Sequence, residues 1–89
     1  MKVKQVKIFS KHALEQIERR GLSKQTIDDV LEFPSSIIKE DADVEIYQKL
    51  VFENGRHYLY RVFVNRLKIP PLVITSYKTS KTDKYENQI

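Results

Sequence analysis

Arg61 is the residue of this sequence with the best case for contacting an anion. It lies in the middle of the alternating run Tyr58–Val64 (YLYRVFV), which is typical of a β-strand, on a face otherwise built of Phe, Leu and Ile. An unpaired charge in such surroundings is costly, so either an anionic group meets the guanidinium or that part of the face is open to solvent. The structural alternative is a partly buried arginine held by Gln48 or by an acidic neighbour.

His12 is the second candidate, in the first turn of a predicted helix. On a helical wheel it shares a polar stripe with Gln16 and Arg19, on the side away from the apolar positions. A histidine and an arginine near a helix N-terminus, which favours anions, could contact a phosphate. The alternative is a solvated helix face with a Glu15–Arg19 pair.

The third cluster is the segment 75–85, TSYKTSKTDKY, near the C-terminus. Hydroxyls, lysines and phenol rings interleaved in this way suit a phosphate backbone and stacked bases. The alternative is a soluble polar tail. The candidate residues in this segment are Thr75, Tyr77, Lys78, Lys81, Lys84 and Tyr85.

Other kinds of site find little support. The sequence has two histidines, no cysteine, no HExxH or GxSxG motif and no glycine-rich phosphate loop. We therefore expect neither a metal nor a cofactor. Metal-independent RNA cleavage remains, which needs a base for the 2′-hydroxyl, an acid for the leaving 5′-oxygen and cations for the developing charge. His12, Arg61, Lys78 and a phenol or hydroxyl of the tail could fill these places if the fold brings them together.

The charge of the chain favours an anionic partner. Residues 1–44 hold eight basic and eight acidic side chains, whereas residues 45–89 hold eight basic and four acidic ones, so the whole net charge of +4 lies in the second half. Eighty-nine residues predict a single domain, 1–89. The absence of cysteine and of an apolar run near twenty residues predicts a cytoplasmic protein without a membrane partner.

The strongest local signal is Asn54-Gly55, which joins two β-rich runs between Val44 and Val64. This dipeptide favours a two-residue type I′ hairpin because both turn residues must accept positive φ. The register then pairs Glu53 with Arg56 and, five pairs further, Gln48 with Arg61. Tyr47, Lys49, Val51, Tyr58, Tyr60, Val62 and Val64 lie on the opposite face from Arg61.

Two helices precede the hairpin. Ser10 predicts an N-cap for a helix over Lys11–Arg20, which Gly21 ends as a left-handed C′ residue. Ser23 predicts the cap of a second helix, which runs to about Phe33, before Pro34. Short strands are possible at 3–9 and 35–39, and Leu72–Lys78 predicts the last strand, with a polar tail that frays beyond Tyr85. The expected fold is α+β, with two N-terminal helices packed on a three- to four-stranded antiparallel sheet.

Three segments resemble the small bacterial family DUF4258: FSKHALEQIERRGLSKQTIDDVLEFP at 9–34, YLYRVFV at 58–64 and LVITSYKTSKTDKY at 72–85. That family is similar to the RelE/ParE-like toxins, which are metal-independent ribonucleases with two helices on an antiparallel sheet. The family pattern matches His12, Arg19 or Arg20 with Gly21, Arg61, Thr75, Tyr77, Lys78 and Tyr85. By this analogy Arg61 holds the scissile phosphate, His12 transfers a proton, and Tyr85 or Lys78 stacks or acts as an acid.

The resemblance thus implies a toxin-like ribonuclease that cleaves RNA by attack of the 2′-hydroxyl. His12, Arg61, Lys78 and Tyr85 would be catalytic, while Arg19, Arg20, Thr75, Tyr77, Lys81 and Lys84 would bind RNA. The expected partners are RNA, on or off the ribosome, and a small acidic antitoxin. The alternative is a non-catalytic RNA- or protein-binding module on the same RelE-like fold.

Overall fold

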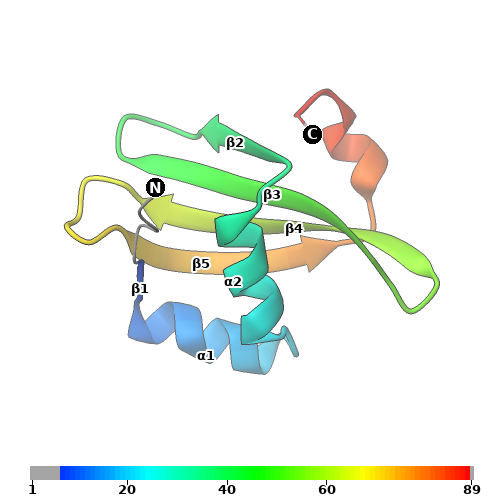
Figure 1. The fold of residues 1–89 in the computed structure, drawn as a ribbon, viewed down its shortest axis with the longest axis horizontal. Helices are drawn as coiled ribbons and strands as arrows, with labels where there is room; N and C mark the ends of the chain where they lie inside the picture. The colour runs from blue at the N-terminus through cyan, green and yellow to red at the C-terminus, as the bar shows by residue number, and fades with distance from the viewer. Residues whose placement is uncertain (1–6, 89) are drawn as a thin grey trace, which may run out of the picture.

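In the computed structural model, which describes residues 7–88, two helices lie against one side of a five-stranded sheet (Figure 1). Strand order is β1-β5-β4-β3-β2. The elements are β1 (Ile8–Phe9), α1 (Lys11–Arg19), α2 (Lys24–Glu32), β2 (Ser36–Lys39), β3 (Val44–Glu53), β4 (Arg56–Asn65), β5 (Leu72–Thr79) and the 3-10 helix η1 (Thr82–Gln88). No helix in this part of the chain is long and apolar enough to cross a bilayer.

The β3–β4 hairpin sets the register of the sheet. Asn54 and Gly55 have φ of 52° and 74°, as a type I′ turn requires. Glu53 pairs with Arg56, and the pairing continues without a shift through Gln48 with Arg61 to Val44 with Asn65. The predicted register is therefore confirmed over the whole hairpin.

The prediction of three to four antiparallel strands was wrong, because the sheet has five strands and is mixed. β2 pairs antiparallel with β3, and β5 pairs antiparallel with β4 across a bulge near Phe63. β1 is the exception, since it pairs in parallel with β5 through Ile8 with Leu72 and Phe9 with Val73. The chain crosses to the other edge of the sheet between β1 and β2, so the first strand can lie beside the last.

The helix boundaries follow their caps. The Ser10 hydroxyl accepts a hydrogen bond from the Ala13 amide at 3.0 Å, and the Ser23 hydroxyl accepts one from the Thr26 amide at 3.4 Å. At the end of α1, Gly21 has a φ of 64°, and the Leu22 amide bonds the Ile17 carbonyl at 2.8 Å. These contacts confirm the predicted helix pair.

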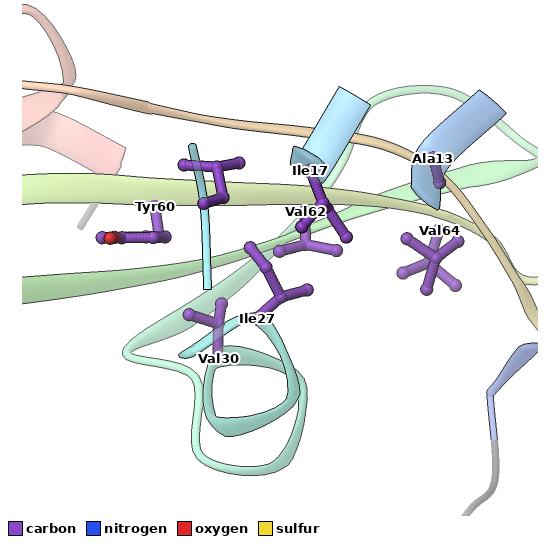
Figure 2. Packing of buried hydrophobic residues seen from close by; sticks show 9 residues of the cluster. Ala13, Ile17, Ile27, Val30, Tyr60, Val62 and Val64 are labelled. Carbon is purple, nitrogen blue, oxygen red and sulfur yellow. The ribbon is translucent and has the colours of Figure 1, made fainter. Parts of the chain in front are cut away.

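The hydrophobic core lies between the helices and one face of the sheet. Ala13 and Ile17 of α1 and Ile27 and Val30 of α2 face the β4 side chains in Figure 2. The buried sheet residues in this cluster are Tyr60, Val62, Val64 and Val73. Since successive β4 side chains alternate between faces, Arg61 points to the face opposite the helices.

The C-terminal segment is more regular than predicted. Where a frayed tail was expected beyond Tyr85, Thr82–Gln88 form η1, with a kink at Tyr85. η1 contacts β4. Tyr85 of η1 lies beside Arg61, so η1 belongs to the face of the sheet that α1 and α2 leave uncovered.

Candidate functional site

Arg61 is nearly buried on the helix-free face of the sheet, with 9% of the residue exposed. Its Nε donates a hydrogen bond to Gln48 Oε1 at 2.5 Å, and its Nη1 donates one to the Tyr77 hydroxyl at 2.8 Å. Its Nη2 has no hydrogen-bond partner among the side chains that the structure describes. The guanidinium is thus held at two nitrogens, and the third has no partner within that set.

These groups form a continuous polar row across the sheet. Ser36, Gln48, Arg61 and Tyr77 are successive cross-strand partners on β2, β3, β4 and β5. Gln48 Nε2 donates to Ser36 Oγ at 3.3 Å, and the Tyr77 and Tyr85 hydroxyls are 3.3 Å apart. We call these five residues the Arg61 row. It exists because cross-strand partners project to the same face.

Aromatic rings surround the guanidinium. The Arg61 Cζ atom lies 4.5 Å from the ring centroid of Tyr85, 5.7 Å from that of Phe63 and 5.9 Å from that of Tyr77. Guanidinium groups are attracted to ring faces at such distances. The rings stabilise the cation without neutralising its charge.

No carboxylate compensates this charge among the side chains that the structure describes. The ion pairs found there are Lys24–Asp28, Lys49–Asp29 and Lys78–Glu53, and none of them includes Arg61. Every hydrogen-bond acceptor of Arg61 is a neutral oxygen. A nearly buried cation whose partners are neutral attracts an anion.

Tyr77 is held in its neutral form. Burial raises the pKa of its hydroxyl, and the hydrogen bond with Tyr85 raises it further, although Arg61 acts in the opposite direction. The Tyr77 oxygen accepts from Arg61, and its hydroxyl lies 3.3 Å from that of Tyr85. At neutral pH this phenol can donate a proton but is a poor base.

Lys78 lies on the opposite face of the sheet from Arg61, since it follows Tyr77 on β5 and pairs with Tyr60. Its ammonium contacts Glu53 Oε1 at 2.6 Å, and the Tyr60 hydroxyl donates to both carboxylate oxygens at 2.9 and 3.0 Å. The hydrogen bond from Lys78 lowers the pKa of Glu53, and the same contact raises the pKa of Lys78. This lysine is paired within the fold and is not beside Arg61.

His12 and Arg61 are not brought together. His12 is exposed on α1, a helix that packs through Ala13 and Ile17 on the Val62 and Val64 face. Arg61 points from the other face, so the sheet separates the two side chains. The predicted proton transfer by His12 at a phosphate held by Arg61 therefore has no geometric basis.

Two of the predicted RNA-binding residues make internal contacts. Arg20 Nη1 donates to the Ser76 carbonyl oxygen at 2.6 Å, which joins the end of α1 to β5. The Thr75 hydroxyl donates to Gln16 Oε1 of α1. Both contacts hold the helix layer to the sheet.

The remaining predicted residues are exposed cations. Arg19 is exposed on α1, and its side chain makes no hydrogen bond or ion pair with the described residues. Lys81 and Lys84 are exposed around the start of η1, and Lys84 Nζ lies 5.7 Å from the Tyr85 ring centroid. These two lysines add positive charge to the segment that carries Tyr85. Within residues 7–88, no three His, Cys, Asp or Glu side chains cluster as metal ligands would.

Comparison with protein families identifies the family of this chain. The model of a domain of unknown function, DUF4258, matches residues 9–81. The chain belongs to the DUF4258 family. No curated protein and no solved structure matches this DUF4258 chain. A likeness of this chain to the RelE/ParE-like toxins is therefore a hypothesis, and so are a toxin-like activity and toxin-like partners.

Sequence reasoning about this DUF4258 chain assigned Gln48 only a structural part and missed Ser36. A signal for Gln48 was present, because the Asn54-Gly55 register places it opposite Arg61. Ser36 had no comparable signal, since it lies on a short strand whose pairing no turn dipeptide fixes. Tyr77 meets Arg61 through the β4–β5 register, and only the approach of Tyr85 depends on the position of η1.

Proposed function

We propose that this DUF4258 protein binds RNA through the helix-free face of its sheet, with Arg61 contacting a backbone phosphate. The observation that carries the proposal is the environment of Arg61, a nearly buried guanidinium with neutral acceptors and one nitrogen that has no partner among the described residues. The planar fork of arginine suits phosphate oxygens. An RNA phosphate would supply the negative charge that the described side chains around Arg61 do not.

The surroundings support RNA over a small anion. Tyr77 and Tyr85 lie next to the guanidinium and offer phenol rings and hydroxyls, while Lys81 and Lys84 are exposed on the adjoining segment. Rings beside cations are the usual equipment for single-stranded nucleic acid, because bases stack on the rings and phosphates meet the cations. The excess of positive charge in residues 45–89 favours the same partner.

RNA cleavage is the second candidate, and the position of Tyr77 beside Arg61 favours it. In this reaction the 2′-oxygen attacks phosphorus, the bond to the 5′-oxygen breaks, and a proton passes to that oxygen. Tyr77, whose hydroxyl lies 2.8 Å from Arg61 Nη1, is the proton donor that this candidate would use. The described residues of the Arg61 row include no base for the 2′-hydroxyl, so binding is the primary proposal. In a toxin–antitoxin pair, a small acidic antitoxin would cover this same face.

The test is the affinity for a labelled single-stranded RNA oligonucleotide over a series of salt concentrations. Arg61→Met keeps an unbranched apolar side chain and removes the charge, so it should weaken binding and lower the salt slope by about one unit. His12→Ala, on the other side of the sheet, is the control and should behave as wild type. Equal affinity and slope for wild type and Arg61→Met, both folded, would overturn the proposal.

Cleavage is measured with the same RNA in excess EDTA. Under the second candidate, wild type leaves 2′,3′-cyclic phosphate ends, and both Arg61→Met and Tyr77→Phe reduce the rate. RNA that is bound and stays intact, both alone and on translating ribosomes, would leave the binding function and remove the ribonuclease.

A further inference from the structure

Gln48 is the neutral hydrogen-bond acceptor that holds the Arg61 guanidinium from the neighbouring strand. It is fully buried in the middle of β3 and lies directly opposite Arg61 in the register. Its Oε1 accepts from Arg61 Nε at 2.5 Å, and its Nε2 donates to Ser36 Oγ at 3.3 Å. Because a guanidinium has only donors, the amide oxygen must face Arg61, and the contact with Ser36 holds the amide in that orientation.

The choice of a neutral acceptor has a consequence for the ligand. A carboxylate at this position would pair with Arg61 inside the protein and cancel its charge, whereas an apolar side chain would leave Nε buried without a partner. The amide of Gln48 avoids both outcomes, since it satisfies Nε and adds no charge. The outer nitrogen Nη2 stays without a partner in the described range.

We propose that Gln48 is a positioning residue for phosphate recognition, which orients the Arg61 guanidinium through a neutral contact and so keeps its charge available to a phosphodiester of single-stranded RNA. This inference rests on the proposed function of the Arg61 row. It assigns the recognition of one phosphate to two residues, one that carries the charge and one that aims it. Gln48 itself lies behind Arg61 and contacts no RNA.

Gln48 has two effects on Arg61: it leaves the charge of the guanidinium uncompensated, and it orients the group. Two substitutions at Gln48 test these effects separately. Gln48→Glu preserves the size of the side chain and the acceptor for Nε, but it adds a negative charge beside Arg61. We expect RNA affinity to fall on the order of tenfold at low salt and the salt slope to fall by about one unit, as in Arg61→Met. Gln48→Met removes the acceptor and adds no charge, so affinity should fall several-fold while the slope stays at the wild-type value.

The probe is a fluorescent single-stranded oligonucleotide of mixed sequence with 2′-O-methyl groups, which cannot be cleaved by 2′-hydroxyl attack. The matched control is Gln25→Glu, which makes the same change in net charge at an exposed position of α2 on the helix side. It should bind RNA nearly as wild type does. Cooperative thermal unfolding shows that each variant is folded.

The outcomes distinguish this inference from the proposed function. Wild-type affinity and slope in folded Gln48→Glu, together with weak binding by Arg61→Met, would overturn the role of Gln48 alone. If Gln48→Glu does not fold, wild-type affinity in Gln48→Met would overturn it. If neither wild type nor Arg61→Met binds RNA at low salt, the proposed function itself fails, and an acidic protein becomes the partner to test.

Discussion

Arg20 and Arg61 are both arginines that donate to neutral oxygens, yet their settings give them different uses. Arg20 meets the Ser76 carbonyl from the end of α1, across the boundary between helix and sheet. Arg61 meets side chains of its own sheet and stays nearly buried among rings. The first contact joins two layers, and the second leaves a cation poised at one face.

The adjacent pair Arg19 and Arg20 allows a matched test at this scale. Arg20→Ala removes the bond to the Ser76 carbonyl, so we expect the free energy of unfolding to fall by about 1 kcal/mol. Arg19→Ala removes an exposed charge without a partner in the described range and should change it by less than about 0.5 kcal/mol. Urea denaturation of both variants measures the difference, and equal values would show that the Arg20 contact contributes nothing to stability.

Ser76 offers a test of opposite sign. Its hydroxyl is fully buried and has no hydrogen-bond partner within the described residues. Burying an unsatisfied hydroxyl costs about 1 to 3 kcal/mol, so Ser76→Ala should raise the free energy of unfolding by about 1 kcal/mol. The backbone carbonyl that Arg20 contacts is retained in this variant. A loss of stability in denaturant would mean that the hydroxyl has a partner in solution.

At the scale of elements, the β3–β4 hairpin organises both faces of the sheet. Its register places the polar row on one face and Tyr60 with Glu53 on the other. β5 then adds one contact to each, since Tyr77 and Lys78 are consecutive and point to opposite sides. The alternation of a single strand therefore separates the candidate site from the Glu53 contact.

The Glu53 contact predicts a dependence of stability on pH. Because the folded state lowers the pKa of Glu53, chiefly through Lys78, this group adds stability above the ordinary carboxyl pKa of about 4.3 and loses it as the pH falls through the lowered value. Glu53→Gln should lower the free energy of unfolding by less than about 1 kcal/mol at neutral pH, since the side chains of Glu53 and Lys78 are both partly exposed to solvent. Unfolding measured from neutral to acidic pH should show the two proteins converging. A constant difference would remove the ion pair as its cause.

The elements also show what sequence alone could predict. Ser10, Ser23, Gly21 and Asn54-Gly55 are local signals whose conformations need few distant contacts, and the structure confirms each of them. The pairing of β1 with β5 and the position of η1 depend on contacts between distant parts of the chain, and no local signal specifies them. For the same reason the sequence could not show that His12 and Arg61 lie apart. The helix face of His12 and the strand face of Arg61 were each predicted, but the sequence did not specify which face of the sheet the helices cover.

For the whole molecule, the outcome is a sheet with two dissimilar faces. One face packs on the helices through an apolar cluster, and the other carries a polar row that ends under η1. The apolar face accounts for the fold, and the polar row has the features expected of a binding surface. Substitutions on the polar row should for this reason affect RNA affinity more than substitutions on the exposed sides of α1 and α2.

The parallel pairing of β1 with β5 also constrains how the chain folds as it is synthesised. Ile8 donates its amide to the Pro71 carbonyl, and Ala13 and Ile17 pack in a cluster with Val64 and Val73. At a translation rate of about 5 to 20 residues per second, these partners of α1 appear roughly 2 to 12 seconds after it. Until then the apolar sides of the N-terminal helices remain uncovered. The helices therefore cannot complete their packing before β4 and β5 have been synthesised.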